Sequence, residues 1–261
     1  MIVTSAVYVI VLREFKRFFR QRGRLLTTLV RPLLWLFIVG TGLSRLVSPP
    51  GAGAGAAGSG EYMQFLLPGV IGMTILFSSI FSTMSVVWDR EFGFLREMLV
   101  APVSRLTIVT GKLLSGTALS LFQGMMLLIV APLIGVKIGI GDIVAMVFLV
   151  SLVSFSLTSL GLFIAAHLKS LEGFNVIMNF LILPMFFLSG ALYPVRHLPT
   201  PLRLATYINP LSYGIDAFKH VLLPGGGRLS PEFPLAFDII FVSVFAAVMM
   251  ALSARAFSRR G

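Results

Sequence analysis

The sequence predicts an all-α integral membrane protein, and three observations support this fold class. Hydrophobic residues make up 57% of the 261 residues, charged residues only 12%, and the mean hydropathy is +0.96. A composition this apolar is not that of a soluble domain. Six continuously apolar segments are each long enough to cross a hydrocarbon core of about 30 Å, which takes about 20 helical residues. Membrane barrel strands would instead alternate apolar and polar residues over about ten positions.

The six predicted membrane spans form a single transmembrane domain that covers residues 1–261. We expect the spans at residues 28–46, 63–87, 106–134, 143–167, 174–192 and 233–254. The distribution of Lys and Arg sets their orientation, because cytoplasmic segments carry the excess of positive charge. With the N-terminus inside, 15 of the 21 Lys and Arg residues fall on the inner side and six on the outer side. Both termini of this multi-pass chain are therefore predicted to be cytoplasmic.

The first 27 residues are predicted to form an amphipathic helix in the membrane interface. Arg13, Arg17 and Arg20 are spaced four and three residues apart, so they share one helical face, while aromatic and leucine side chains lie on another. The apolar run precedes the basic residues, which is the reverse of a secretory signal peptide. The basic face either anchors the topology or contacts membrane lipids or a cytoplasmic partner. Its candidate contact residues are Arg13, Lys16, Arg17 and Arg20.

Residues 88–105, which we call the charged segment, separate the second predicted span from the third. They hold three of the chain's ten acidic residues within nine positions. On a helical wheel Trp88 and Phe92 lie on an apolar arc, whereas Asp89 and the other charged side chains face water. Phe94 lies at the edge of the polar arc, as expected of an aromatic anchor for another protein. We predict a cytoplasmic helix that docks a partner, with a solvated loop as the alternative. The candidate docking residues are Asp89, Arg90, Glu91, Phe94, Arg96, Glu97 and Met98.

Two motifs of this sequence resemble the membrane subunit of type-2 ATP-binding-cassette (ABC) exporters. The first is the stretch from residue 91 to 105, followed by Gly111 and Lys112 at the start of the third span. The second lies between the last two spans, and its signature residues are Pro194, Asn209, Pro210 and Tyr213. The resemblance covers essentially the whole chain. One departure is Lys219, which stands where the family's pattern leads us to expect an arginine.

The resemblance implies a homodimer of six-helix subunits in the cytoplasmic (inner) membrane of a prokaryote. The charged segment would act as a coupling helix that docks on a separate ABC ATPase subunit, present in two copies. ATP and magnesium would bind to that partner, since this sequence lacks the Gly-x-x-x-x-Gly-Lys-Ser/Thr loop that holds phosphates. Apolar spans with few charges favour an amphiphilic cargo, such as a lipid, a lipid-linked saccharide or a hydrophobic drug, with a wide polysaccharide channel lined by aromatic residues as the alternative. In this chain we expect no catalytic residue, no cofactor and no metal.

Two polar features inside or between the spans have more than one interpretation. Residues 193–232 are expected to form short outer helices, broken at Asn209 and Pro210, that either gate the exit or cover the outer end of the dimer. On the fifth span, Glu172, Asn175 and Asn179 share a face near the inner end. They could line an access route for a polar headgroup, although hydrogen bonding between helices is a common role for such residues.

Other classes of protein fit the sequence less well. Nucleic-acid binding is not expected despite the net charge of +11, because the basic residues are dispersed between spans. An ion-coupled secondary transporter would need buried carboxylates or broken helices near the membrane midplane. A membrane-embedded enzyme would need a convergent acid/base or metal cluster. Cysteine is absent and the three histidines are scattered, so no metal-ligand pattern is predicted.

Overall fold

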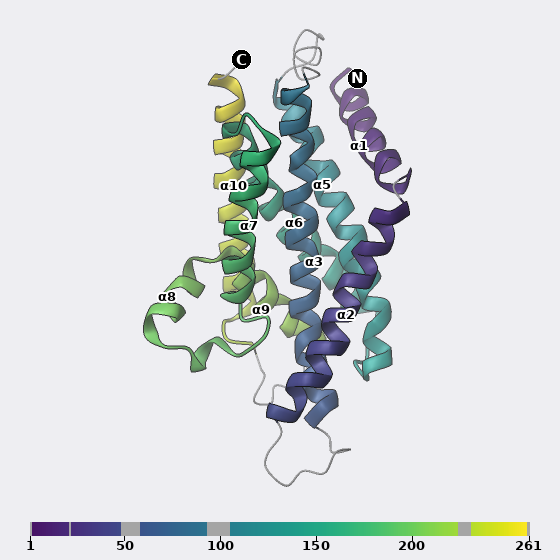
Figure 1. The fold of residues 1–261 in the computed structure, drawn as a ribbon, viewed down its shortest axis with the longest axis vertical. Helices are drawn as coiled ribbons and strands as arrows, with labels where there is room; N and C mark the ends of the chain where they lie inside the picture. The colour runs from purple at the N-terminus through teal and green to yellow at the C-terminus, as the bar shows by residue number, and fades with distance from the viewer. Residues whose placement is uncertain (1, 21, 48–57, 93–104, 224–230, 260–261) are drawn as a thin grey trace.

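The computed structural model describes residues 2–20, 22–47, 58–92, 105–223 and 231–259, and every regular element in these ranges is helical. The helices that correspond to the six predicted spans form one elongated bundle (Figure 1): α2 (Arg22–Val47), α3 (Gly58–Glu91), α5 (Arg105–Leu127), α6 (Ile140–His167), α7 (Leu171–Phe187) and α10 (Leu235–Arg259). The remaining elements are α1 (Ile2–Arg20), η1 (Leu128–Ile134), η2 (Val195–His197), α8 (Thr200–Ile208) and α9 (Pro210–Leu222). The all-α fold predicted from the sequence is confirmed.

Four of the described helical segments are long and apolar enough to cross a membrane. They are Gly60–Glu91, Leu106–Ile134, Ile140–His167 and Leu235–Phe257. The apolar parts of α2 and α7, Val30–Gly42 and Leu171–Phe187, are shorter, so the count of six spans stays a prediction. Figure 1 shows the first turns of α1 and the last turns of α10 at the same end of the bundle. That arrangement agrees with an even number of crossings.

Several predicted boundaries differ from the structure for local reasons. The third predicted span does not remain α-helical to residue 134, because a tighter 3-10 helix that contains Pro132 follows α5 and ends at Gly135, where φ is +83°. Proline lacks the N–H that would continue an α-helix. The fifth span ends at Phe187 rather than at 192, ahead of a turn in which Gly190 has a φ of +71°. Helix α3 continues to Glu91, so the first four residues of the charged segment belong to it.

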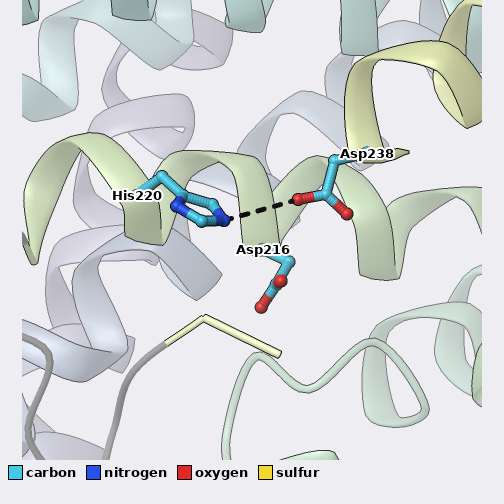
Figure 2. Close-up of side chains that lie close together, drawn as sticks. All are labelled: Asp216, His220 and Asp238. Atoms are coloured by element: carbon cyan, nitrogen blue, oxygen red, sulfur yellow. Dashed lines mark ion pairs between the residues drawn. The ribbon is translucent and has the colours of Figure 1, made fainter. Parts of the chain in front are cut away.

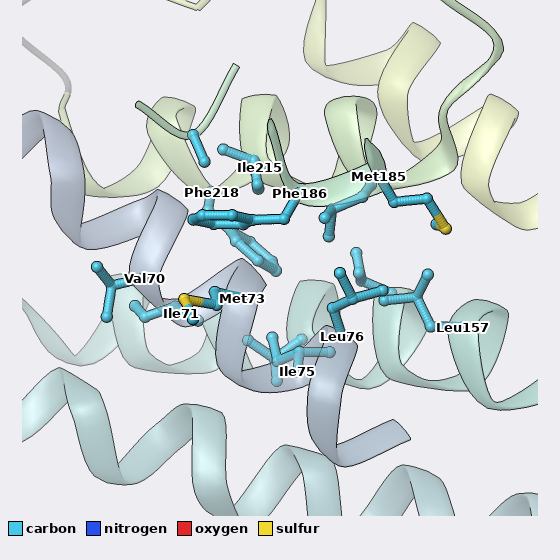
Figure 3. Close-up of a cluster of buried hydrophobic side chains, with 14 of the residues drawn as sticks. Val70, Ile71, Met73, Ile75, Leu76, Leu157, Met185, Phe186, Ile215 and Phe218 are labelled. Carbon is cyan, nitrogen blue, oxygen red and sulfur yellow. The ribbon is translucent and has the colours of Figure 1, made fainter. Parts of the chain in front are cut away.

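Helix α3 is the centre of the bundle. In the most apolar stretch of α3, 67% of the residues are buried inside the chain, whereas the corresponding share in α10 is 17%. Helix α3 packs on α2, α5, α6, α7 and α9. In Figure 3, Ile71 and Leu76 of α3 belong to the same cluster as Leu157 of α6, Phe186 of α7 and Phe218 of α9. Lipid tails are as apolar as these side chains, so close packing rather than removal from water holds such helices together. A displacement of α3 would therefore disturb most of the bundle.

Glycine residues let α3 approach its neighbours closely. A methyl group added at Gly69 would lie 2.5 Å from the carbonyl oxygen of Ala191 and 2.8 Å from its Cβ. Gly161 of α6 faces Thr83 of α3 in a similar way, with the threonine hydroxyl oxygen 2.9 Å from the place of an added methyl group. Small residues at such crossings allow two backbones to come together in a membrane.

We expect Gly69→Ala to lower the stability of the bundle by about 1–3 kcal/mol, because the added methyl group forces the backbone at Ala191 to move. Thermal unfolding of the detergent-solubilised protein measures this change. Gly60→Ala in the same helix is the control, since no atom lies within 4 Å of its added methyl group. If both variants melted with the wild-type protein, the close contact between α3 and Ala191 would not contribute to stability.

Candidate functional site

The candidate site lies at the end of α3 that leads into the charged segment. Three of the seven candidate docking residues are described by the structure, namely Asp89, Arg90 and Glu91. The other four, Phe94, Arg96, Glu97 and Met98, lie outside the described residues. Docking of a partner on these seven side chains therefore stays a prediction. The three described residues have defined contacts within the chain.

Asp89 belongs to a buried ionic cluster around Lys112 of α5. The Lys112 Nζ atom lies 2.9 Å from a carboxylate oxygen of Asp89, 2.9 Å from one of Glu14 and 2.9 Å from the hydroxyl of Ser85. Arg13 forms a longer ion pair of 3.5 Å with Asp89. Only 8% of the Asp89 side chain and 5% of the Lys112 side chain are exposed. The expectation that Asp89 faces water is wrong, because α5 covers that side of α3.

The same cluster fixes α1 to the bundle through Glu14. Burial alone would raise the pKa of Glu14, but the Lys112 ammonium group, assisted by the Arg13 guanidinium, lowers that pKa below its ordinary value of 4.5. Glu14 is therefore ionised at neutral pH. Charges removed from water are tolerated only when they are paired. The ammonium group of Lys112 thus holds α1, α3 and α5 in one relative position.

Arg90 and Glu91 bind the facing ends of α6 and α7. The Arg90 Nη1 atom donates to the carbonyl oxygens of Ala165, Ala166 and Leu168 at distances of 3.3, 3.1 and 2.6 Å. A carboxylate oxygen of Glu91 accepts the backbone N–H of residue 171, at 2.8 Å. The last carbonyls and the first N–H groups of a helix lack partners within the helix and carry partial negative and positive charge. A cation therefore caps the end of α6, and an anion caps the start of α7.

We call Asp89, Arg90 and Glu91, together with Glu14 and Lys112, the α3 junction. Through these residues the end of α3 is bonded to α1, α5, α6 and α7. The charged groups of the α3 junction bond to other helices of the same chain, so they connect α3 to its neighbours. A force applied at this end of α3 would reach four other helices.

A cavity of about 240 Å³ lies beside the α3 junction, between α1, α3 and α5. Phe18 and Phe81 contribute apolar walls, and Glu14 and Arg17 contribute charged groups. The guanidinium of Arg17 lies 5.7 Å from the ring centroid of Trp88, within the range of a cation–π contact. The cavity therefore combines aromatic surface with both signs of charge.

Helix α1 is shorter than the predicted interfacial helix of residues 1–27, since α2 begins at Arg22. Its surface is amphipathic: Tyr8 and Val9 are 64% and 60% exposed, while Phe18 is buried. The four basic candidates lie at exposed positions: Arg13, Lys16, Arg17 and Arg20. Placement of α1 in the membrane interface stays a prediction.

The predicted outer signature includes the residues that connect α8 to α9. The side chain of Asn209 accepts a hydrogen bond from the Leu211 N–H at 3.1 Å and donates one to the Met185 carbonyl oxygen at 2.6 Å. Asparagine is a favoured residue at this capping position. Pro210 follows as the first residue of α9, where its missing N–H leaves no helical bond unmade. This pair starts α9 and attaches it to the end of α7.

Tyr213 secures α9 against the last helix. Its ring stacks on Phe241 of α10 with 3.9 Å between the ring centroids, and its hydroxyl donates to the Tyr207 carbonyl oxygen at 2.8 Å. Helix α9 is buried at most positions and packs on α3, α6 and α10. Pro194 does not join these contacts, because it lies at the start of η2. The structure therefore brings together three of the four signature residues.

The three polar candidates on α7 face away from the centre of the chain. Glu172 and Asn179 are exposed and Asn175 is half-buried. They share this surface with apolar side chains such as Phe180, which is 83% exposed. Their assignment to a substrate pathway stays a prediction.

A second polar cluster, which the sequence analysis did not find, joins α9 to α10 (Figure 2). It consists of Asp216, His220 and Asp238, whose nearest ligand atoms all lie within 4.8 Å of one another. Asp216 and His220 are four residues apart on one helix, and that spacing was visible in the sequence. Asp238 is distant in the sequence, and its proximity depends on how α10 packs on α9. The spacing alone could not have predicted the trio.

Lys219 lies next to this cluster and is 2% exposed. Its Nζ atom lies 3.1 Å from the Gly190 carbonyl oxygen, 3.8 Å from a carboxylate oxygen of Asp216 and 4.9 Å from the ring centroid of Phe65. Lys219, which stands where an arginine was expected, thus makes one contact each with the turn at Gly190, with Asp216 of its own helix and with Phe65 of α3. It joins α9 to α3 and to the turn after α7.

Comparison with known proteins gives a match along most of the chain. Residues 5–223 match the family described as ABC-2 type transporter. The chain is also similar to the inner membrane transport permease YadH of Escherichia coli (strain K12), with 26% identity over 213 residues that cover 81% of this chain and 80% of the relative. It is 27% identical to nodulation protein J of Rhizobium meliloti (strain 1021) over 238 residues, which cover 90% of this chain and 86% of the relative.

We expect Lys112→Met to destabilise the folded protein by about 3–5 kcal/mol, because it leaves the buried carboxylates of Glu14 and Asp89 without their shared cation. Thermal unfolding in detergent measures the loss, and adding Asp89→Asn to the same chain should restore part of it. Lys137→Met, at an exposed position, is the matched control. A melting temperature equal to that of the control would contradict the role of Lys112 in joining the three helices.

Proposed function

Because this chain belongs to the ABC-2 type transporter family, we propose that it is the permease subunit of an ATP-driven exporter that carries an amphiphilic substrate across the cytoplasmic membrane. Its relatives include proteins named as transport permeases, which supports a transport role. The resemblance to the membrane subunit of type-2 ABC transporters noted in the sequence is confirmed by the match to residues 5–223. The excess of Lys and Arg favours a cytoplasmic location for the charged segment and for both termini.

In this proposal ATP is hydrolysed by a separate ATPase subunit, and this chain transmits the resulting movement. The observation that carries the proposal is the α3 junction. Residues 93–104 connect α3 directly to α5 in the sequence, so a partner bound there acts on both helix ends. The bonds of Asp89, Arg90 and Glu91 then extend the displacement to α1, α6 and α7. Closure of two ATPase subunits would in this way move a connected group of helices.

We further propose that two copies of this chain assemble and that the substrate route runs between them. The amide side chains of Asn175 and Asn179 lie on the outward face of α7. A polar side chain at membrane depth is costly against lipid, and such groups normally face another helix or a water-filled path. A second copy packed along α7 would provide either environment. This argument favours a homodimer over an isolated chain.

The cavity beside the α3 junction supports an amphiphilic cargo. Its aromatic walls, formed by residues such as Phe18 and Phe81, suit an acyl chain or another apolar group. The charged groups of Glu14 and Arg17 suit a polar head. A lipid, a lipid-linked saccharide or a hydrophobic drug has both parts, whereas an inorganic ion or an amino acid has no long apolar part. The cavity would serve as the access point on the side of α1.

We expect Phe94→Ala and Glu97→Lys to reduce the amount of ATPase subunit that co-purifies with this chain by about tenfold or more, as for an aromatic or charged hot spot of an interface. The assay co-expresses the chain with an ABC ATPase subunit of the same organism. Glu91 is unsuitable for this test, because its replacement also removes the cap on α7. Glu61→Gln, an exposed acid in the first turn of α3, is the control.

Undiminished ATPase binding and transport by both variants would rule out docking at the charged segment. Transport by vesicles that contain this chain alone, energised by an ion gradient, would favour an ion-coupled secondary transporter. Chemical conversion of a lipid by the chain alone would favour a membrane-embedded enzyme.

The Arg90 side chain is engaged with the end of α6, so it is the docking candidate whose replacement should affect the partner least. We expect Arg90→Gln to leave the ATPase bound but to lower transport severalfold at an unchanged rate of ATP hydrolysis. The variant loses the charged hydrogen bonds, together worth about 1.5–3 kcal/mol, that tie α3 to the end of α6. Transport and phosphate release are measured in parallel in proteoliposomes. Lys169→Gln changes an exposed charge in the same α6–α7 turn and is the control. Normal coupling in the Arg90 variant would show that α6 is not driven through this contact.

A further inference from the structure

Asp238 in the first turn of α10 is a fully buried carboxylate without a hydrogen-bond donor. Its exposed fraction is 0%, and neither carboxylate oxygen accepts a hydrogen bond from the part of the chain that the structure describes. The Nε2 atom of His220 lies 3.9 Å away. An ionised carboxylate in such surroundings is strongly unfavourable. Asp238 must therefore either hold a proton or face a cation.

The neighbouring basic side chains are paired with other acids. Arg196 donates its backbone N–H to the Glu232 carboxylate at 3.1 Å, and its side chain lies 4.0 Å from that same carboxylate. Lys219 lies 3.8 Å from Asp216 and donates to the Gly190 carbonyl oxygen. These pairings account for the charges of Glu232 and Asp216. Asp238 has only His220 beside it in the cluster of Figure 2, and at 3.9 Å that contact compensates the carboxylate charge only when the imidazole is protonated. With a neutral imidazole, the charge of Asp238 needs another cation.

The arrangement around Asp238 is that of a ligand set. Asp216 and His220 are spaced four residues apart on α9; in Figure 2 the His220 ring points toward Asp238 of α10, whereas the Asp216 carboxylate points toward the backbone at residues 232 and 233. The Asp216 carboxylate is held in place by the backbone N–H groups of Glu232 and Phe233, at 2.8 to 3.0 Å. Such outer contacts orient the ligands of metal sites.

The contact between His220 and Phe233 brings a backbone carbonyl oxygen, a further possible metal ligand, close to the cluster. The His220 Nε2 atom lies 2.8 Å from the Phe233 carbonyl oxygen. With the proton on Nε2 this contact is a hydrogen bond. With the proton on Nδ1, the lone pairs of the Nε2 atom and of the Phe233 carbonyl oxygen face each other. Two acceptors this close repel each other unless a cation lies near both. The same geometry thus accommodates a metal ion without a new fold.

We propose that Asp216, His220 and Asp238 bind one divalent transition-metal cation that joins α9 to α10. The cation would compensate the Asp238 carboxylate, which Lys219 leaves unpaired, and a neutral imidazole favours ions such as Zn²⁺ or Mn²⁺ over Ca²⁺ and Mg²⁺, which prefer oxygen ligands alone. Ligand atoms bound at about 2.1 Å lie no more than about 4.2 Å apart. The observed 4.8 Å therefore requires only a small movement of the side chains.

The position of this site gives the cation a structural consequence. Helix α9 is buried between α3, α6 and α10, and the Tyr213–Phe241 contact already holds it against α10. The His220 side chain is 27% exposed, so the cluster lies at the surface of the chain on that side. A bound cation would add a second attachment of α9 to the last helix. This inference does not depend on the cargo or on an ATPase partner.

The test is to titrate the metal-free, detergent-solubilised full chain with Zn²⁺ and, separately, with Mn²⁺. We expect one bound ion per chain by elemental analysis after dialysis, and a melting temperature that rises with the concentration of Zn²⁺. Asp238→Asn and His220→Gln should each weaken binding by about 100-fold or more. Glu61→Gln should bind as the wild-type chain does. Melting curves recorded in a chelator establish that each variant is folded.

Two results would overturn the metal site. One is a wild-type chain that binds no stoichiometric Zn²⁺ or Mn²⁺. In that case an Asp238→Asn variant as stable as the wild type in chelator would mean that the buried carboxyl group holds a proton, and a less stable variant would mean that Asp238 pairs with a protonated His220. The other is unchanged affinity in folded Asp238→Asn and His220→Gln variants, which would place the ion elsewhere.

Discussion

A single ammonium group, that of Lys112, decides how three helices meet at one end of this protein. Its two carboxylate partners come from α1 and α3, and none of the three groups can move far without leaving a charge unpaired away from water. Buried ion pairs add little stability compared with apolar packing, but their geometry specifies one relative position of the elements that carry them. The ion pairs of Lys112 therefore oppose both a sliding of the central helix α3 along its axis and a rotation about that axis.

The opposite end of the bundle is organised by a different constraint. Helix α9 is short and buried, so the polar backbone groups at its ends need partners within the protein. Asn209 satisfies the start of α9, and His220 and Asp216 bind the backbone near residue 233. Lys219 connects this assembly to the turn at Gly190. The close-packed α3 contacts helices of both polar ends, namely α5 and α9.

Hydropathy and turn chemistry were enough to predict the helical elements from the sequence. The long apolar runs became α3, α5, α6 and α10, and the break at Asn209 and Pro210 separates α8 from α9. The burial of Asp89 could not be predicted, because a helical wheel separates lipid from water but does not show the face that a third helix covers. The pairing of Asp89 with Lys112 depends on the register between two helices.

The same limit applies to Asp238. A lone acid at the end of an apolar span has no periodic pattern to indicate a partner. Its proximity to Asp216 and His220 arises only when α10 packs on α9. The helix ends bound by Arg90 and Glu91 are likewise invisible in the sequence, since backbone groups carry no sequence signal. Local chemistry predicts where helices begin and end, and tertiary packing decides which charges become internal.

The adjacent positions of Arg90 and Glu91 have a consequence for how this chain can vary in length. Two consecutive residues of one helix bind the end of α6 and the start of α7, so both helix ends must arrive within the reach of neighbouring side chains. Residues 168–170 are the whole connection between those helices. Leu168 and Ser170 are extended, so one inserted residue would lengthen the connection by about 3.5 Å and could move the start of α7 away from the Glu91 carboxylate that caps it. Insertions and deletions should therefore be excluded from this three-residue connection during evolution, even where substitutions in it are accepted.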